Sequence, residues 1–167
     1  MPHADFDDFY ASTCRRVVGQ VYAMIGDIGE AEDAVQEAFI RAWQRWTTLR
    51  EYNDPEAWVR TVAYRAAVSS WRKAVNRFTA HRRHGPGADV PELGPEHVVL
   101  VQAMRKLTAD QRRVVVLHHL VGLPVEDIAR ETGSAIGTVK SRLARGRRAL
   151  AGELGELPGQ ERRTTDA

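Results

Sequence analysis

The chain has 167 residues, of which 43% are hydrophobic and 28% are charged, with a formal net charge of +2. This length and apolar content suit one ordinary domain or two small ones, and the single cysteine, Cys14, excludes an internal disulfide and zinc sites built on paired cysteines. The acidic N-terminus does not resemble a signal peptide and the apolar runs are too short to cross a membrane, so a reducing cytoplasmic compartment is expected.

Charge is distributed unevenly along the chain. Residues 1–78 contain ten Lys and Arg against eleven Asp and Glu, a net charge of −1. Residues 105–150 contain ten Lys and Arg against four Asp and Glu, a net charge of +6. This asymmetry indicates that the two halves have different partners, and the basic half is suited to a polyanion.

Apolar residues recur at helical spacing through the first half of the chain. Helices are expected over residues 5–25, with Gly26 as the C-cap, and over residues 30–46. The apolar stripe of the second helix comprises Val35, Ala38, Phe39, Ala42, Trp43 and Trp46. The pattern breaks over residues 47–54. Asp54 and Pro55 then supply an N-cap and a first helical residue for one long helix to residue 76. Its predicted core side excludes Arg60, Arg65, Arg72 and Lys73.

The second half of the chain predicts another helical unit. Residues 79–95 are rich in Gly and Pro, which indicates a flexible linker. A helix is expected from Glu96, followed by a capping box at residues 108–111 and a further helix to Gly122. Residues 153–167 predict a disordered tail. The expected architecture is therefore all-α, with two small helical domains over 1–78 and 96–152 joined by the linker.

Residues 124–150 are the most informative stretch for function. They predict two short helices around a tight turn, in which Ala129 permits a close approach, Gly133 supplies a positive φ and Val139 packs back on the first helix. This is the arrangement of a helix-turn-helix, whose second helix enters the DNA major groove. Residues 140–148 carry five cations and no acid, which disfavours a merely solvated face. A helical hairpin with another purpose remains the alternative.

Three segments together resemble one family. Residues 32–43 resemble the region of bacterial sigma factors that binds core polymerase, residues 54–60 resemble the start of the promoter-melting helix, and residues 137–143 resemble the upstream-element reader. They occur in the family's order and spacing, so the chain resembles an extracytoplasmic-function (ECF) RNA polymerase sigma factor, which keeps only domains 2 and 4. Residues 70–73 resemble the actinobacterial branch. Arg65 and Ser69 stand where many members carry Asn and Asp, which puts the preferred −10 sequence in doubt.

The resemblance implies promoter-specific initiation, in which domain 4 reads the −35 element as duplex and domain 2 opens the −10 element. The implied contacts with core RNA polymerase are Asp33, Gln36, Glu37 and Arg41. The implied −10 contacts are Leu49, Tyr52, Asn53, Trp58, Arg60, Arg65 and Arg72. The implied −35 contacts are Thr138, Lys140, Ser141, Arg142 and Arg145.

Alternatives stay open at several of these positions. The acidic side of the second helix could simply be solvated, and Trp58 either stacks on an unpaired base or anchors the core. Residues 47–54 resemble the segment that captures a flipped base. The resemblance also implies an anti-sigma factor that wedges between the domains. The rival functions are a helix-turn-helix regulator that acts without core polymerase and a recombinase-like enzyme, for which no nucleophile with a supporting base is seen.

No cofactor or metal is expected. His81 and His84 lie three residues apart in the linker, and neither a cysteine nor a nearby acid completes a ligand set around them. His118 and His119 end a predicted helix, where packing or surface placement is favoured over metal binding.

Overall fold

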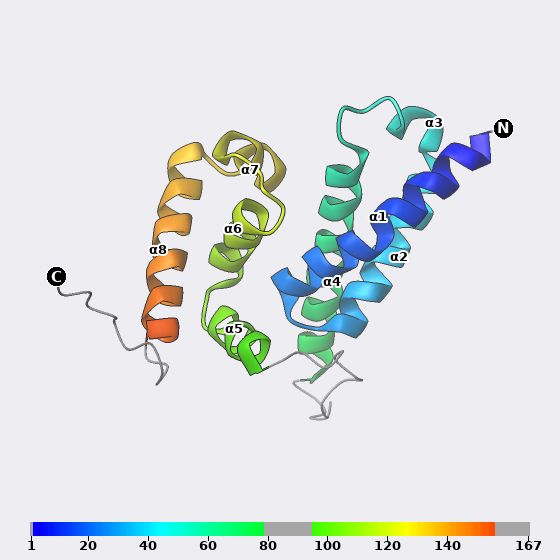
Figure 1. Ribbon diagram of the computed structural model, residues 1–167. Coiled ribbons are helices and arrows are strands. Elements are labelled where there is room, and N and C mark those ends of the chain that lie inside the picture. The colour runs from blue at the N-terminus through cyan, green and yellow to red at the C-terminus, as the bar shows by residue number, and fades with distance from the viewer. Residues whose placement is uncertain (1, 79–94, 156–167) are drawn as a thin grey trace.

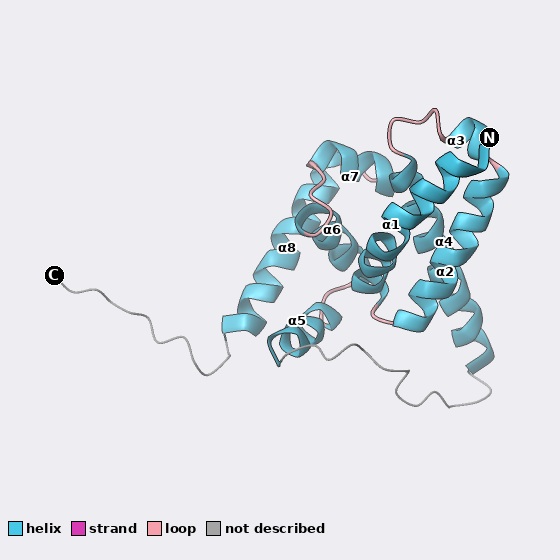
Figure 2. Cartoon of the chain, turned by 45° about the vertical axis from the view of Figure 1, so that its right-hand side comes forward, coloured by secondary structure: helices cyan, strands magenta, loops and turns pink. Residues whose placement is uncertain are grey.

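The computed structural model describes residues 2–78 and 95–155, and these residues form helices and loops without a strand (Figures 1 and 2). The helices are α1 (Pro2–Ile25), α2 (Ile28–Gln44), α3 (Trp46–Leu49), α4 (Pro55–Phe78), α5 (Pro95–Arg105), α6 (Ala109–His119), α7 (Val125–Thr132) and α8 (Ile136–Gly155). Helices α1–α4 form one unit and α5–α8 form a second unit beside it, which confirms the expected all-α fold. The predicted linker, except Pro95, lies outside the described residues.

The core of the first unit joins α1, α2 and α4 through small aliphatic side chains, and an aromatic cluster between α1, α2 and α3 extends it. The ring of Phe9 stacks on that of Trp46 at 4.9 Å between centroids, and Phe6 meets the same indole edge-on at 5.3 Å. Phe39 of α2 is 3% exposed and closes this cluster from the other side. Full burial of an aromatic ring such as that of Phe39 contributes about 1.5–3 kcal/mol, and the partly buried Phe6 and Phe9 contribute less. The cluster helps to fix α1 across α2 and leaves the other face of α2 in solvent.

The second unit has a smaller, aliphatic core. Residues of α6, α7 and α8 supply it, including Leu117, Ile128 and Val139, each with no exposed surface. Gly146 of α8 lies against α6, where a Cβ would come within 2.7 Å of the Cγ2 atom of Val115. A glycine is therefore needed at this point for α8 to approach α6 so closely.

Helix ends follow the capping residues in the sequence. The Asp54 carboxylate accepts a hydrogen bond from the backbone N–H of Ala57 at 2.9 Å, as predicted. Thr108 and Gln111 form the predicted capping box, with both reciprocal hydrogen bonds at 3.2 Å. Gly26 has a φ of 79° directly after α1, which confirms it as the residue that ends that helix.

Several sequence predictions are corrected by the structure. Helix α2 spans 28–44 rather than 30–46, because the Asp27 side chain caps it from the front by accepting from the N–H of Glu30. Residues 46–49 form the short helix α3 instead of a break, and α8 continues to Gly155, beyond the predicted boundary at 152. Trp43, predicted in the apolar stripe, is 53% exposed because it lies at the edge of that stripe.

The two units share a second apolar cluster. Met24 of α1 and Tyr64 of α4 are buried together with residues of α6, α7 and α8, including Leu117 and Ile128. Helix α1 lies against α6 across this boundary (Figure 2). The most consequential correction is also here. Arg60, expected away from the core side of α4, is only 2% exposed.

Candidate nucleic-acid and protein interfaces

Helices α7 and α8 form a helix-turn-helix whose buried and exposed sides are clearly divided. Gly133 has a φ of 66° and ends α7, while Ala129 and Val139 are buried where the helices meet, so all three predicted roles are confirmed. The predicted DNA contacts that are exposed on α8 are Thr138, Lys140, Ser141 and Arg145. Such an exposed cationic helix has the form required for insertion in a major groove.

Arg142 differs from the other predicted −35 contacts, because it is already engaged within the protein. Its guanidinium donates to an Asp110 carboxylate oxygen at 2.6 Å and to the Ser134 hydroxyl at 3.0 Å. The Arg142 side chain is 28% exposed and that of Asp110 is 62% exposed. These bonds orient the guanidinium at the solvent boundary, and such an exposed ion pair is weak enough to be exchanged for a DNA contact.

The two adjacent histidines are both accounted for by contacts inside the second unit. The Nδ1 atom of His118 lies 2.9 Å from the carbonyl oxygen of Leu123. Arg147 donates from its Nε to Nε2 of His119 at 3.1 Å. Burial, together with the nearby charge of Arg147, lowers the pKa of His119 and favours its neutral form. Among the residues that the structure describes, no group of three or more His, Cys, Asp or Glu is placed to hold a metal.

The outer face of α2 presents acids and exposed apolar side chains together. Asp33, Gln36, Glu37 and Arg41 are all exposed, with Glu37 and Arg41 joined in an ion pair one turn apart. Sequence reasoning missed Ile40, which is 60% exposed on this face. The sequence feature that could have identified Ile40 is an apolar side chain at a position outside the apolar stripe of the helix.

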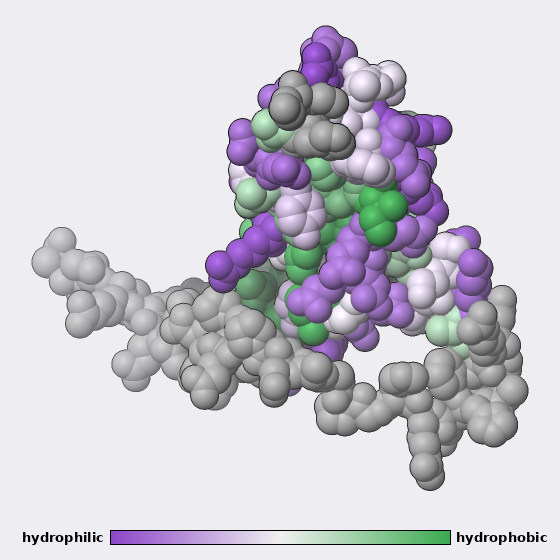
Figure 3. Space-filling model, turned by 90° about the vertical axis from the view of Figure 1, so that its right-hand side faces the viewer, coloured by the Kyte–Doolittle hydropathy of each residue, from purple (hydrophilic) through white to green (hydrophobic). Residues whose placement is uncertain are grey.

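A groove adjoins these residues between α1 and α2. It has a volume of about 460 Å³ and is lined by Phe6, Tyr10, Gln36, Phe39, Ile40 and Trp43. Viewed from the side of α1 and α2, the surface shows green apolar patches set between purple hydrophilic side chains (Figure 3). Large apolar side chains next to charged ones at an exposed surface are typical of protein interfaces.

A small pocket lies where the loop after α3 meets the start of α4. It has a volume of about 150 Å³ and is lined by Arg45, Thr48, Leu49, Tyr52 and Trp58. Three of the predicted −10 residues therefore meet in one place, namely Leu49, Tyr52 and Trp58. Leu49 is 2% exposed and forms the floor, whereas Tyr52 is 49% exposed. Trp58 also packs against the core of the first unit, so its two predicted roles are compatible.

The remaining predicted −10 residues lie apart from this pocket. Asn53 is exposed in the loop but does not line the pocket. Arg65 and Arg72 are exposed on α4, and Arg65 shares a groove between α2 and α4 with Glu37 and Arg41. Arg60 is instead buried between the two units, where it pairs with Glu131 of α7, so DNA has no access to it in this arrangement.

An apolar cavity of about 440 Å³ opens at the boundary between the units. Its walls come from the end of α1 and from α5, α6 and α8, with Tyr22, Met104 and Leu150 among them. Leu100 and Leu120 at this cavity are 45% and 59% exposed. Arg105 and Arg112 also line it. The cavity is therefore apolar with basic groups in its wall.

Comparisons with known families match both units. Residues 9–77 match the model of sigma-70 region 2, and residues 97–150 match the model of sigma-70 region 4. The ECF RNA polymerase sigma factor SigL of Mycobacterium tuberculosis is 33% identical over 141 residues, which are 80% of this chain and 80% of that protein. The RNA polymerase sigma-E factor of Streptomyces coelicolor is 28% identical over 152 residues, covering 90% of this chain and 86% of that protein.

Solved structures give the same result. The sigma factor RpoE of Bartonella quintana, solved in complex with the anti-sigma factor NepR, superposes with a TM-score of 0.79 at 25% identity. The match covers 91% of this chain and 98% of RpoE. Within the two described segments, no helix combines the length and apolarity needed to span a membrane.

Proposed function

Because the chain belongs to the ECF RNA polymerase sigma factors, non-enzymatic subunits that direct promoter-specific initiation through regions 2 and 4, we propose a division of labour between its two units. The first unit, residues 2–78, binds core RNA polymerase and opens the −10 element. The second unit, residues 95–155, reads the −35 element as duplex DNA. Both polymerase and promoter are reached in the cytoplasm.

The outer face of α2 is the proposed polymerase surface. Its polar contacts are Asp33, Gln36, Glu37 and Arg41, and Ile40 extends the surface as an apolar anchor. The opposite side of α2 is buried against α1 and α4, so the outer face is the one available to a partner. A patch that combines apolar anchors with charges gives both affinity and correct orientation.

Helix α8 is the proposed −35 reader. Arg142 is the best candidate for a bidentate contact with guanine, because its guanidinium is already held in position by Asp110 and Ser134. Arg145 is the second candidate for base contact. Thr138, Lys140 and Ser141 are proposed to bind phosphates, which set the register of α8 in the groove.

The pocket below the α3–α4 loop is the proposed site for a flipped −10 base. Tyr52 and Trp58 supply aromatic surface, and stacking on an aromatic ring contributes about 1–3 kcal/mol per base. Such contacts offset the few kcal/mol needed to unstack a base. Arg65 and Arg72, exposed further along α4, are proposed to hold the backbone of the opened strand, and Asn53 to contact it from the loop.

An anti-sigma factor is the proposed regulatory partner. The apolar cavity between the units is wide enough for large side chains, and Arg105 and Arg112 in its wall favour an occupant with acidic groups. The related RpoE is solved in complex with the anti-sigma factor NepR. We propose that an amphipathic helix of such a regulator inserts its apolar face here.

The observation that supports this proposal most is the separation of two exposed surfaces of opposite charge, acids on α2 and cations on α8. Run-off transcription with purified core polymerase tests it directly. A double charge reversal, Asp33→Lys with Glu37→Lys, should abolish promoter-specific product and holoenzyme formation. Asp8→Lys, at an exposed acid of α1 that belongs to neither the proposed surface nor the adjoining groove, is the matched control and should retain both. Tight promoter binding without core polymerase would favour the rival helix-turn-helix regulator.

A further inference from the structure

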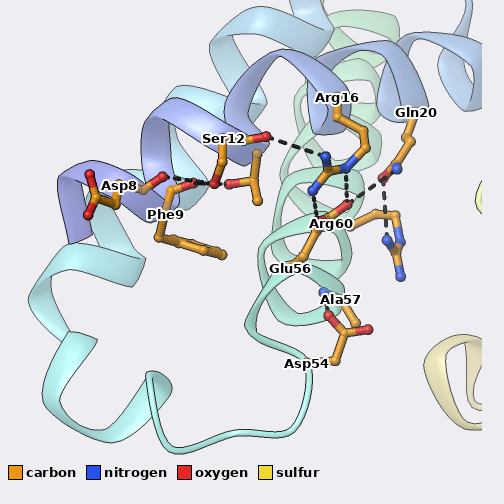
Figure 4. Close-up of polar contacts among 10 residues, drawn as sticks. Asp8, Phe9, Ser12, Arg16, Gln20, Asp54, Glu56, Ala57 and Arg60 are labelled. Carbon is orange, nitrogen blue, oxygen red and sulfur yellow. Dashed lines mark hydrogen bonds and ion pairs between the residues drawn. The ribbon is translucent and has the colours of Figure 1, made fainter. Parts of the chain in front are cut away.

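The contact between the two units contains an ion pair that water barely reaches. Arg60 of α4 donates from Nε and Nη2 to the two carboxylate oxygens of Glu131 of α7, at 2.9 and 2.7 Å. The two side chains are 2% and 7% exposed. Nη1 of Arg60 donates to the Gln20 side chain at 3.3 Å. Figure 4 shows Gln20 of α1 directed at Arg60, beside the pair formed by Arg16 and Glu56.

A second contact lies one helical turn further along α4. The guanidinium carbon of Arg113 of α6 is 4.1 Å from the centroid of the Tyr64 ring, in a cation–π arrangement. Arg113 also donates to the backbone carbonyl of Glu131 at 3.5 Å. Because residues four apart share one helix face, α4 presents a guanidinium and an aromatic ring side by side to the second unit.

This combination of groups is the one that single-stranded nucleic acid requires. A cation binds the phosphate backbone, and an aromatic ring stacks with an unpaired base. In the structure, the Glu131 carboxylate meets Arg60 in the bidentate manner that a phosphate uses, and the cation of Arg113 covers the Tyr64 ring where a base would stack. The same helix begins at the proposed pocket for the flipped base, which Trp58 lines.

We propose that the face of α4 formed by Arg60 and Tyr64 is a binding surface for the opened promoter strand, and that Glu131 and Arg113 of the second unit cover it in the free chain. This inference rests on the proposed function, because it assigns the strand to the first unit. The free protein therefore excludes DNA from its own −10 surface until the two units separate.

The covering contact is suited to being broken. Transfer of two charges out of water is costly, and a buried ion pair recovers that cost only with good geometry and complete hydrogen bonding. Arg113 lacks complete bonding, since its Nε has no partner among the described residues. Burial also lowers the pKa of Arg113. Separation would hydrate Arg113, Arg60 and Glu131 together, which limits the free energy needed for opening.

The experiment removes the charge of Glu131 in the full chain. Glu131→Gln is compared with Glu126→Gln, an exposed acid of the same helix that serves as a matched control for net charge. The probe is a fluorescein-labelled single strand of 20 nucleotides with mixed sequence, and binding is followed by fluorescence anisotropy. Glu131→Gln should bind the strand roughly tenfold more tightly than Glu126→Gln, because water-exposed Arg60 is freed for phosphate.

A second readout follows the distance between the units. Fluorophores are attached to cysteines introduced as Glu32→Cys and Ala144→Cys, both exposed, in a Cys14→Ser background. Energy transfer should fall in Glu131→Gln and stay unchanged in Glu126→Gln. The exchange of the pair, Arg60→Glu with Glu131→Arg, should restore high energy transfer, which shows that any loss reflects the contact and not misfolding.

The outcomes separate this inference from the proposed function. Equal strand affinity in the Glu131→Gln and Glu126→Gln proteins overturns the inference, and so does a loss of energy transfer without tighter strand binding. In either case the proposed function survives if the unmodified chain still gives promoter-specific run-off product with core polymerase. Absence of that product rejects the proposed function itself.

Discussion

Arg60 and Arg142 are both held by an acid from another helix, but their surroundings differ. Arg60 makes two bonds to Glu131 and is 2% exposed. Arg142 makes one bond to Asp110, and its side chain is 28% exposed. An exposed pair contributes about 0–1 kcal/mol and exchanges readily for another anion. A buried pair is released only when its surroundings move apart. The comparison shows that one residue type can form an exchangeable ion pair at the surface of α8 and a covered ion pair on α4.

The largest expected effect is on the free energy of unfolding, when each of these two arginines is replaced by alanine in turn. Arg60→Ala should lower the free energy of unfolding by about 3 kcal/mol, because Glu131 is left without its partner in a buried site. Arg142→Ala should lower it by less than about 1 kcal/mol. Urea denaturation of the two variants measures both. Adding Glu131→Ala to Arg60→Ala should recover part of the lost stability. Equal losses in Arg60→Ala and Arg142→Ala would contradict the distinction between a buried and an exposed pair.

Arg142 should matter more for DNA than for stability. Arg142→Ala is expected to weaken binding of the holoenzyme to its promoter by about 1–3 kcal/mol and to relax the preference at one −35 base. Asp110→Asn, which keeps the shape of the partner, should change binding far less. Competition assays with single-base variants of the promoter measure this. A uniform loss across all those promoters would instead assign Arg142 to a phosphate.

The packing of the second unit offers a sharper test of how α8 is positioned. Gly146→Ala should destabilise the protein by about 1–2 kcal/mol, because the new Cβ would lie 2.7 Å from a methyl group of Val115, and overpacking outweighs the gain in helix propensity. Combination with Val115→Ala should relieve the clash, so the two effects should not add. Thermal denaturation of the three variants is the measurement, and a stabilised Gly146→Ala protein would contradict the close approach.

Lys140 is expected to behave as a phosphate contact. Lys140→Ala should weaken promoter binding by a similar factor for every −35 sequence and reduce the slope of log affinity against log salt concentration by about 1. Titrations at several salt concentrations give the slope directly. Arg130→Ala, an exposed cation on α7, serves as the comparison and should leave the slope nearly unchanged.

The smallest expected effect is on acid stability in the first unit. The hydrogen bond from Arg16 lowers the pKa of Glu56 below its usual 4.5, although burial opposes the shift. A carboxyl group whose folded pKa is depressed stabilises the fold above its unfolded pKa, and this stability is lost as the pH falls through the folded value. Glu56→Gln should therefore reduce stability at pH 7 but much less at pH 3. The urea concentration at the midpoint of unfolding, measured at pH 7 and at pH 3, tests this. Glu51→Gln, at an exposed acid, is the control.

Sequence reasoning succeeded where the determinants were local. The cap at Asp54, the capping box at Thr108 and the positive φ of Gly133 each depend on residues within a few positions, and all three were predicted. The buried role of Arg60 was missed, because its partner Glu131 lies 71 positions away and no periodic pattern joins them. A charge at a helical position can lie toward solvent or toward a distant helix, and only the packing of the units decides between them.

The candidate interfaces divide in the same way. The cations of α8 stand out in sequence because no acid accompanies them, and four of the five predicted contacts are exposed. Leu49, predicted as a −10 contact, is 2% exposed and lines the pocket, because residues 46–49 form a helix that turns its side chain inward. Ile40 gives too weak a signal in sequence, because single exposed apolar residues are common on any protein surface.

The incompletely bonded Arg113 bears on any effort to engineer this protein. Replacement of buried ion pairs and cations by apolar side chains of similar volume frequently raises melting temperature. A selection for heat resistance is therefore expected to favour apolar replacements at Arg113, or at Arg60 and Glu131 together. Such variants would hold the two units together more tightly. They would be more thermostable proteins but would initiate transcription less efficiently.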